Sequence, residues 1–327
     1  MFMAHLTNLK QTNIDKIIFN YNILNFINIT PIYDGIQNSN YIINTKNKKY
    51  ILTIFEDKYV KKNINFFLKL LFFCKNNHFN CPSPILDRND DFINFIDNKP
   101  SCIFNFIEGK SYNSKVVNIK SVGMELANLH LITKNFDHKI KMRFNIIFFN
   151  NVIKKYNSYF LKKNPNLIKI FNKTLYEYSN LTKLNLPKAI IHGDLFPDNV
   201  LFKNKNTISG FLDFYFSDYN YLISDLAIVI ISWCFITDAK NKFVLNYEKI
   251  NTLLKGYNSI RNIQISEIDA LIIICKIYCM RFMFTRLLSI NNNYDKNKIL
   301  IKNPNEYIKK LLYFNNETNF RMKIDYE

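Results

Sequence analysis

Residues 190–202 read Ile190-Ile191-His192-Gly193-Asp194-Leu195-Phe196-Pro197-Asp198-Asn199-Val200-Leu201-Phe202. Two short apolar runs enclose a polar turn with the spacing H-x-D-x-x-x-x-N. Such runs, bounded by turn residues, predict short buried strands on either side of a loop. One loop therefore carries a carboxylate and an amide. Asp213 follows the next apolar run, residues 208–212, and the predicted hairpin returns this second acid to the same place.

The three oxygen-bearing side chains of this pattern suit phosphoryl transfer, which depends on positioning and on charge neutralisation. Asp194 fits a base that accepts a hydroxyl proton. Asn199 and Asp213 offer the hard oxygen ligands that Mg²⁺ prefers. A turn in which Asp only caps backbone N–H groups is the plain alternative, but it explains neither Asn199 nor Asp213. His192 is expected to be structural, bonded to loop backbone.

The rest of the chain divides into a strand-rich part and a helical part. Residues 40–44 and 50–55 flank a polar turn and predict a hairpin. Apolar spacing predicts helices at 12–24, 64–75, 114–134, 144–162, 166–182, 224–236, 247–259, 266–290 and 304–314. Further short strands are expected at 92–96, 102–106, 189–191, 200–202 and 208–212. This order predicts an α+β fold with an N-terminal lobe, residues 1–106, and a larger helical lobe, residues 107–327.

Composition limits the classes of partner. The 327 residues carry 44 Lys+Arg against 26 Asp+Glu, a net charge of +18. The basic residues are scattered among Asn, Ile and Phe without a block of five, so we attribute the charge to compositional drift. We expect no nucleic-acid partner. Charges interrupt the apolar stretches 222–236 and 270–288, so no transmembrane helix and no membrane partner are expected.

The six cysteines indicate the compartment. None forms a C-x-x-C pair, and residues 1–20 lack the apolar core and cleavage site of a secretory signal. Reduced cysteines of a cytoplasmic enzyme fit this usage best. The sequence leaves the oligomeric state open.

A second, weaker pattern is Asp34-Gly35-Ile36-Gln37-Asn38-Ser39-Asn40-Tyr41, between the first two predicted strands. A loop here can lay backbone N–H groups over phosphate oxygens. By itself, one glycine in a hairpin is an ordinary turn. The pattern gains value from lying upstream of the two acids in a separate strand-rich lobe.

Together these residues resemble the protein-kinase-like phosphotransferases, and among them the homoserine kinases related to aminoglycoside and choline kinases. The loop at 190–202 is shared by the whole superfamily. The homoserine branch is indicated by its Leu-Phe-Pro-Asp-Asn-Val variant, by Asp213-Phe214-Tyr215-Phe216, and by Arg281-Phe282-Met283-Phe284-Thr285-Arg286-Leu287. Further likeness lies in residues 35–40, 50–56, 225–228, 233–235 and 304–313, so it extends over most of the chain.

The resemblance implies a bilobal fold that binds ATP and Mg²⁺, with Asp194 as catalytic base and Asn199 and Asp213 on the metal. Asp225 would brace the catalytic loop, with His192 as a structural neighbour. The nucleotide would lie on a set of N-terminal residues: Gly35, Gln37, Asn38, Ser39, Asn40 and Thr53. Thr53 stands where the wider superfamily carries a phosphate-pairing Lys; which cation replaces it is open, with Lys58 a candidate.

The implied reaction is transfer of the ATP γ-phosphate to L-homoserine, giving O-phospho-L-homoserine in threonine biosynthesis. Arg281 and Arg286 are candidates for the substrate carboxylate, although their spacing points them apart on one helix. Tyr215 and Trp233 are candidate pocket walls; core packing is the alternative. Another acceptor (choline, an aminoglycoside or a sugar) and a non-catalytic nucleotide-binding relative remain the competing hypotheses.

Overall fold

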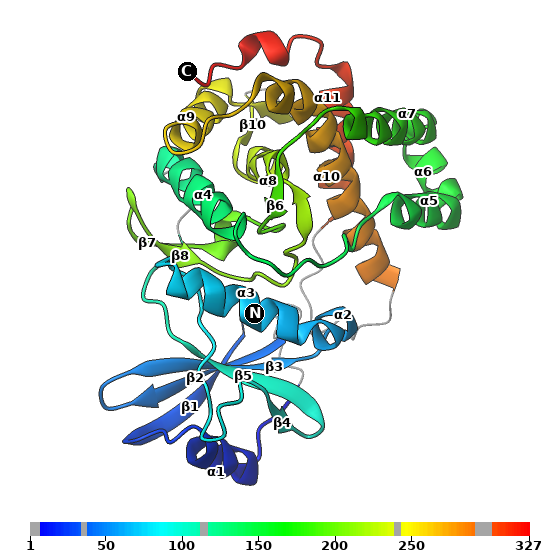
Figure 1. The fold of residues 1–327 in the computed structure, drawn as a ribbon. Helices are drawn as coiled ribbons and strands as arrows, with labels where there is room; N and C mark the ends of the chain where they lie inside the picture. The colour runs from blue at the N-terminus through cyan, green and yellow to red at the C-terminus, as the bar shows by residue number, and fades with distance from the viewer. Residues whose placement is uncertain (1–6, 34–37, 112–116, 239–242, 292–302) are drawn as a thin grey trace. The chain divides into compact units, whose positions relative to one another are not determined.

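The structure is a computed structural model that describes residues 7–33, 38–111, 117–238, 243–291 and 303–327 (Figure 1). Its residues form two compact units. The first unit contains the described residues up to Glu108 together with Gly210–Tyr215. The second contains the remaining residues from Gly109 onward.

The first unit is built on an antiparallel sheet in the order β1-β2-β3-β5-β4. The polar turn between β2 and β3 is closed by Thr45, whose hydroxyl donates to the Lys48 carbonyl at 2.8 Å and accepts from the Lys48 N–H at 3.0 Å. The predicted hairpin is therefore confirmed. The strands are β1 Phe26–Ile32, β2 Asn38–Thr45, β3 Lys49–Phe55, β4 Asn94–Ile96 and β5 Lys99–Asn105.

Alternation along these strands sends side chains to two apolar faces, and a helix covers each (Figure 1). Helix α1 (Gln11–Asn20) packs Ile17 against one face, with Ile43 and Leu52 among its partners. Helix α3 (Ile64–Asn76) covers the other face and follows the short helix α2 (Lys58–Lys62), whose first N–H groups are capped by Asp57.

The second unit is mainly helical. Helix α8 is buried at every position except Ser232, and the long helix α10 packs against α7, α8 and α11 (Figure 1). The unit's helices are α4 Ile119–Thr133, α5 Ile146–Lys155, α6 Asn157–Lys163, α7 Leu167–Asn180, α8 Ile223–Trp233, α9 Tyr247–Asn258, α10 Ile265–Asn291 and α11 Asn305–Asn316. The helix expected over 144–162 is divided because Tyr156 ends α5 with non-helical dihedral angles.

Helices α4 and α9 approach each other through glycine. A Cβ on Gly123 would lie 2.2 Å from the Leu253 carbonyl oxygen, and one on Gly256 would lie 2.3 Å from the Lys120 carbonyl oxygen. Only a residue without a side chain fits such a contact at either position. The two backbones therefore pack directly on each other.

Short strands and turns interrupt these helices. Strand β6 (Lys188–Ile190) pairs antiparallel with β9 (Tyr219–Tyr221), and β7 (Val200–Asn204) pairs with β8 (Thr207–Phe211). A third pair joins β10 (Phe235–Thr237) to β11 (Phe243–Leu245). Strands β9, β10 and β11 were not expected from the sequence. The short 3₁₀ helices are η1 Leu181–Lys183, η2 Pro197–Asn199 and η3 Arg321–Lys323.

The structure bears on the apolar helices and on the cysteines. Within the described ranges, no helix has both the length and the apolar character needed to cross a bilayer. All six cysteines are buried and free.

Candidate active site

The loop that follows β6 is held by Asp225, in the first turn of α8. Its carboxylate accepts hydrogen bonds from the His192 N–H at 2.7 Å and from the Gly193 N–H at 2.8 Å. Gly193 has φ +79°, and a Cβ there would lie 2.3 Å from the Phe216 carbonyl oxygen. Glycine is needed here because it adopts this φ without strain and because it leaves room for the Phe216 carbonyl. One buried acid thus fixes the backbone directly before Asp194.

Two further side chains extend this support. His130 Nε2 lies 3.0 Å from Asp225 Oδ2, and His130 Nδ1 lies 2.7 Å from the Tyr257 hydroxyl. We assign the Nε2 proton to the bond with the carboxylate, since only that arrangement makes both contacts favourable. Burial alone would raise the pKa of Asp225, but bonding to His130 and to the loop N–H groups holds it below its ordinary value. Asp225 therefore supports the loop as a carboxylate.

Asp194 lies at the centre of the loop and is partly exposed. Its N–H donates to His192 Nδ1 at 3.2 Å, which holds the ring in the structural role expected of it. One carboxylate oxygen is 3.5 Å from Arg281 Nη2, and the other is 3.5 Å from Asn199 Nδ2. The Arg281 guanidinium and the Asn199 amide therefore lie on the two oxygens of this carboxylate.

Asn199 ends the 3₁₀ helix η2. Its Nδ2 donates to the Asp194 carbonyl at 2.7 Å, which fixes the orientation of the amide. The amide oxygen is a hard donor of the kind that suits Mg²⁺, an ion that keeps several waters. No cluster of three or more His, Cys, Asp or Glu that could hold a metal occurs among the described residues. An amide and a carboxylate are hard oxygen donors of the kind that such an ion takes. The pair predicted from the sequence, Asn199 and Asp213, stays a prediction.

Trp233, the last residue of α8, also supports the loop. Its indole N–H donates to the Leu195 carbonyl at 2.9 Å, and the side chain is buried. This contact gives Trp233 a direct link to the residue after Asp194. Its predicted place in the wall of a substrate pocket stays a prediction.

The two candidate arginines of α10 have different surroundings. Arg281 lies against the loop that carries Asp194, where its Nη1 donates to the Gly193 carbonyl. Arg286 bonds to Glu306 at 2.8 Å and to the Asn303 carbonyl at 3.1 Å. The structure therefore brings Arg281 to Asp194 and pairs Arg286 with α11. A role of Arg286 in substrate binding stays a prediction.

Asp213 and Tyr215 belong to the first unit. Asp213 follows β8 with φ +61°, an uncommon backbone conformation for a residue with a side chain. The Tyr215 ring packs edge-on against Phe55 at 5.3 Å and Phe67 at 5.7 Å between centroids. Burial, with the Asp213 charge nearby, raises the pKa of the Tyr215 hydroxyl well above its usual range. In the first unit this ring is a packing residue.

The predicted nucleotide-binding residues start with Gly35 and Gln37, which lie outside the described residues. The Thr53 hydroxyl donates to Asn40 Oδ1 at 2.8 Å across the β2–β3 pair. Ser39 donates to Glu56 Oε1 at 3.2 Å, and the Glu56 N–H donates to Asn38 Oδ1 at 3.3 Å. Strand β2 thus carries its polar side chains next to the end of β3.

A cation accompanies this polar group. Lys99, at the start of β5, forms an ion pair of 2.8 Å with Glu56. Burial raises the pKa of Glu56, but bonds from Lys99 and Thr7 hold it below its ordinary value. The sequence-based candidate for a replacement cation, Lys58, is exposed at the start of α2. Within the described residues, Lys99 is the cation that forms an ion pair with Glu56.

Comparison with known proteins gives this arrangement a family. The model of the phosphotransferase enzyme family matches residues 28–248. The chain belongs to this family. The match includes the loop around Asp194 and Asn199 as well as Asp213 and Asp225. The enzyme is therefore a phosphotransferase.

Curated relatives extend the likeness to nearly the whole chain. The homoserine kinase of Brucella anthropi is 30% identical over 312 residues, 95% of this chain and 94% of the relative. The homoserine kinase of Bartonella henselae is 30% identical over 319 residues, 96% of this chain and 97% of the relative. Such relatives support a kinase that acts on a small substrate.

Solved structures share the protein-kinase-like fold. Amicoumacin kinase has a TM-score of 0.68 at 15% identity and covers 97% of this chain and 94% of its own. The choline kinase LicA from Streptococcus pneumoniae has a TM-score of 0.65 at 17% identity, covering 94% of this chain and 99% of its own. The predicted fold class is confirmed by these neighbours and by the described sheet and helices.

Some residues around the loop gave little sequence signal. His130 belongs to no motif of the sequence, yet it contacts Asp225, which follows 95 residues later. Lys99 belongs to none either, although it pairs with Glu56. Asp218 was not singled out, but it lies buried near Arg281. Each role depends on a partner distant in the sequence.

Proposed function

We propose that the protein is a homoserine kinase, which transfers the γ-phosphate of ATP to the hydroxyl of L-homoserine and releases O-phospho-L-homoserine. The observation that carries the proposal is about 30% identity to homoserine kinases over some 95% of both chains. The Asp194 loop adds a chemical reason, because it presents a braced carboxylate next to the Asn199 amide. We place the reaction in threonine biosynthesis.

In the proposed reaction Asp194 accepts the proton of the acceptor hydroxyl, so that the oxygen gains nucleophilic character as it attacks phosphorus. Asp225 and Trp233 hold the loop backbone on both sides of Asp194, which keeps the carboxylate in place. Such general-base assistance contributes roughly 10²–10⁴-fold to the rate. The amide oxygen of Asn199 and the carboxylate of Asp213 would hold Mg²⁺, which neutralises phosphate charge when bound with ATP.

We infer that ATP binds along the N-terminal strands, with Asn38, Ser39, Asn40 and Thr53 as candidate contacts together with Gly35 and Gln37. Glu56 links Asn38 and Ser39, and Thr53 bonds to Asn40. Since six free, buried cysteines suit a reducing compartment, we also propose a cytoplasmic location.

The test of function is a coupled assay of ADP release over a panel of acceptors: L-homoserine, choline, an aminoglycoside and a hexose. We expect turnover with homoserine and at most background rates with the others. A clear preference for choline or for the aminoglycoside would replace homoserine with that acceptor. Absence of turnover with every acceptor, while ATP binds, would favour the non-catalytic alternative.

The role of Asp194 is tested separately with Asp194→Asn. We expect kcat to fall by at least about 10²-fold while ATP binding is retained, in line with the contribution of a general base. The matched control is Asp198→Asn, which removes the same charge from an exposed position of the same loop. Turnover of Asp194→Asn at the wild-type rate would contradict the assignment.

A further inference from the structure

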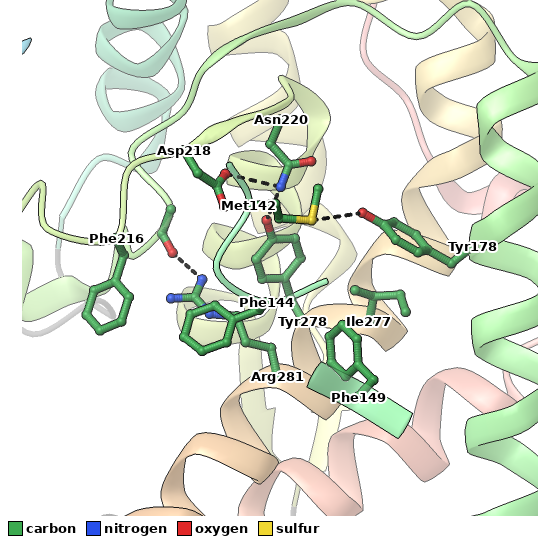
Figure 2. Close-up of a pocket in the computed structure, with 11 residues that line it drawn as sticks. Met142, Phe144, Phe149, Tyr178, Phe216, Asp218, Asn220, Ile277, Tyr278 and Arg281 are labelled. Atoms are coloured by element: carbon green, nitrogen blue, oxygen red, sulfur yellow. Dashed lines mark hydrogen bonds between the residues drawn. The ribbon is translucent and has the colours of Figure 1, made fainter. Parts of the chain in front are cut away.

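A small cavity lies in the second unit beside the catalytic loop (Figure 2). Figure 2 shows Asp218 and Asn220 on one side, the rings of Phe144 and Tyr278 in the middle, and Arg281 extending towards the loop. Gly193, the residue before Asp194, also lines the cavity. The space therefore adjoins the residue to which we assign the catalytic base.

The size of the cavity limits what it can receive. It offers about 10 Å³ to a group the size of water, which is room for roughly one such group. A primary ammonium has this size, with one heavy atom. A trimethylammonium group has four heavy atoms and no N–H with which to bond a carboxylate.

Asp218 gives the cavity a buried negative charge. The residue is 6% exposed, and it accepts from Asn220 Nδ2 at 3.3 Å. The charged and titratable groups that face it are Arg281 on α10 and Asp225 on α8, together with the hydroxyls of Tyr178 and Tyr278. The backbone N–H of Arg143 also bonds to it, and the Arg143 guanidinium lies over the rings of Phe144 and Phe216. Arg281 is the cation that acts on the Asp218 charge, and it also lies 3.5 Å from Asp194.

The balance of these charges favours a second cation. Burial raises the pKa of Asp218 to about 6, and the nearby Arg281 charge only partly opposes that rise. A buried carboxylate that keeps free acceptor positions is stabilised by an additional N–H donor carrying positive charge.

Arg281 supplies the complementary feature. The side chain is 4% exposed, and rings of Phe144 and Phe216 stack on its guanidinium at 4.6 and 5.0 Å from their centroids. Within the described residues, no acceptor bonds to its buried Nε–H. An unsatisfied buried donor costs free energy, which an arriving acceptor recovers. A carboxylate oxygen is the acceptor that a guanidinium prefers.

The geometry points to a subsite for the zwitterionic head group of an amino-acid acceptor, with the α-ammonium in the cavity on Asp218 and the carboxylate beside Arg281 Nε. The inference rests on the proposed function and deepens it. In homoserine both charged groups are attached to one carbon, and two methylene groups separate that carbon from the hydroxyl. A short acceptor of this kind suits a cavity that Gly193 and Arg281 connect to Asp194.

The same subsite selects against the competing acceptors. Choline presents its charge as a trimethylammonium group, which has no N–H to donate to Asp218. A sugar presents no cation to Asp218, so a buried carboxylate would stay uncompensated in its complex. The cavity thus predicts a preference for acceptors with a primary ammonium.

The experiment crosses acceptor analogues with one variant. L-Homoserine is compared with 4-hydroxybutyrate, which lacks the ammonium, and with 3-aminopropan-1-ol, which lacks the carboxylate. With the wild type, we expect kcat/KM for either analogue to be at least about tenfold lower than for homoserine, the low end for a hydrogen bond to a charged group. In Asp218→Asn, kcat/KM for homoserine should fall at least tenfold because KM rises. For 4-hydroxybutyrate, kcat/KM should change less than about threefold.

Glu177→Gln is the control, because Glu177 lies 3.7 Å from Lys276 of α10 and outside the cavity wall. This control should leave kcat/KM for all three acceptors unchanged. KM for ATP should stay constant in both variants. If Asp218→Asn lowers kcat/KM equally for homoserine and 4-hydroxybutyrate, or changes it for neither, the proposed subsite is wrong. Failure of the wild type to phosphorylate homoserine would instead reject the proposed function, so the two failures are distinct.

A pH series on the wild type tests the subsite without any variant. Because Asp218 must be ionised to bind the ammonium, KM for homoserine should rise as pH falls through about 6. KM for 4-hydroxybutyrate should not show this rise, since its binding makes no use of that charge. Identical pH profiles for the two acceptors would overturn the inference.

Discussion

Substitution of Asp225 by Asn tests the support of the catalytic loop most directly. The carboxylate accepts from two loop N–H groups and from His130, at 2.7, 2.8 and 3.0 Å. An amide keeps one acceptor oxygen but turns an NH₂ group towards a buried donor. One to two charge-assisted bonds are therefore lost, each worth about 1.5–3 kcal/mol, so we expect a loss of about 3 kcal/mol in the free energy of unfolding.

The chain contains a single tryptophan, Trp233, whose indole bonds to the Leu195 carbonyl of the same loop. Urea unfolding followed by its fluorescence therefore reports on the unit that is altered. We expect a lower midpoint with an unchanged m-value. In the ADP-release assay kcat should fall at least about tenfold, while KM for ATP stays within about threefold, because the change displaces Asp194, the base we propose, and leaves the proposed nucleotide contacts on the N-terminal strands in place.

The pH dependence has a defined sign. Since the folded pKa of Asp225 is depressed, its contribution to stability is complete above the unfolded value of about 3.9 and is lost as pH falls through the folded pKa. The stability difference between wild type and Asp225→Asn should therefore narrow below about pH 4.

Asp269→Asn is the control, because this exposed acid pairs only with Arg321 at the surface among the contacts described for it. Its effect should remain below about 0.5 kcal/mol, as for other surface ion pairs. An Asp225→Asn protein with the stability and kcat of the wild type would refute the bracing role.

Three other outcomes are expected. Trp233→Phe should lower kcat severalfold and the free energy of unfolding by about 1–3 kcal/mol, because the buried Leu195 carbonyl loses its donor. The ADP-release assay measures the first effect, and urea unfolding followed by circular dichroism measures the second, since the variant lacks the tryptophan. Gly123→Ala should lower the thermal midpoint by several degrees, because the new methyl would lie 2.2 Å from the Leu253 carbonyl oxygen. The native protein should react slowly with a thiol reagent and titrate six cysteines after unfolding.

Local patterns predicted the parts of the fold that local interactions determine. The β2–β3 hairpin and α3 were recognised because apolar alternation and helical spacing are complete within one segment. Strand β9 was missed because its pairing partner, β6, lies about 30 residues earlier and each strand has only three residues. A pairing between such short and distant strands leaves no periodic signal in either sequence.

The candidate site divides in the same way. Asp194 and Asn199 were recognised because one loop carries both at a fixed spacing. Asp218 was not, since its environment is formed by Arg281, 63 positions later, and by the burial of both side chains. Tertiary packing determines such an environment, and no short motif records it.

The relay from Tyr257 through His130 to Asp225 has a consequence for motion. Both ring nitrogens of His130 are engaged, so the imidazole cannot rotate without stranding a buried hydroxyl or a buried charge. The glycine contact between α4 and α9 also fixes the distance over which the relay acts. These contacts favour a loop backbone that moves little during turnover, so the reaction proposed for Asp194 would take place on a rigid support.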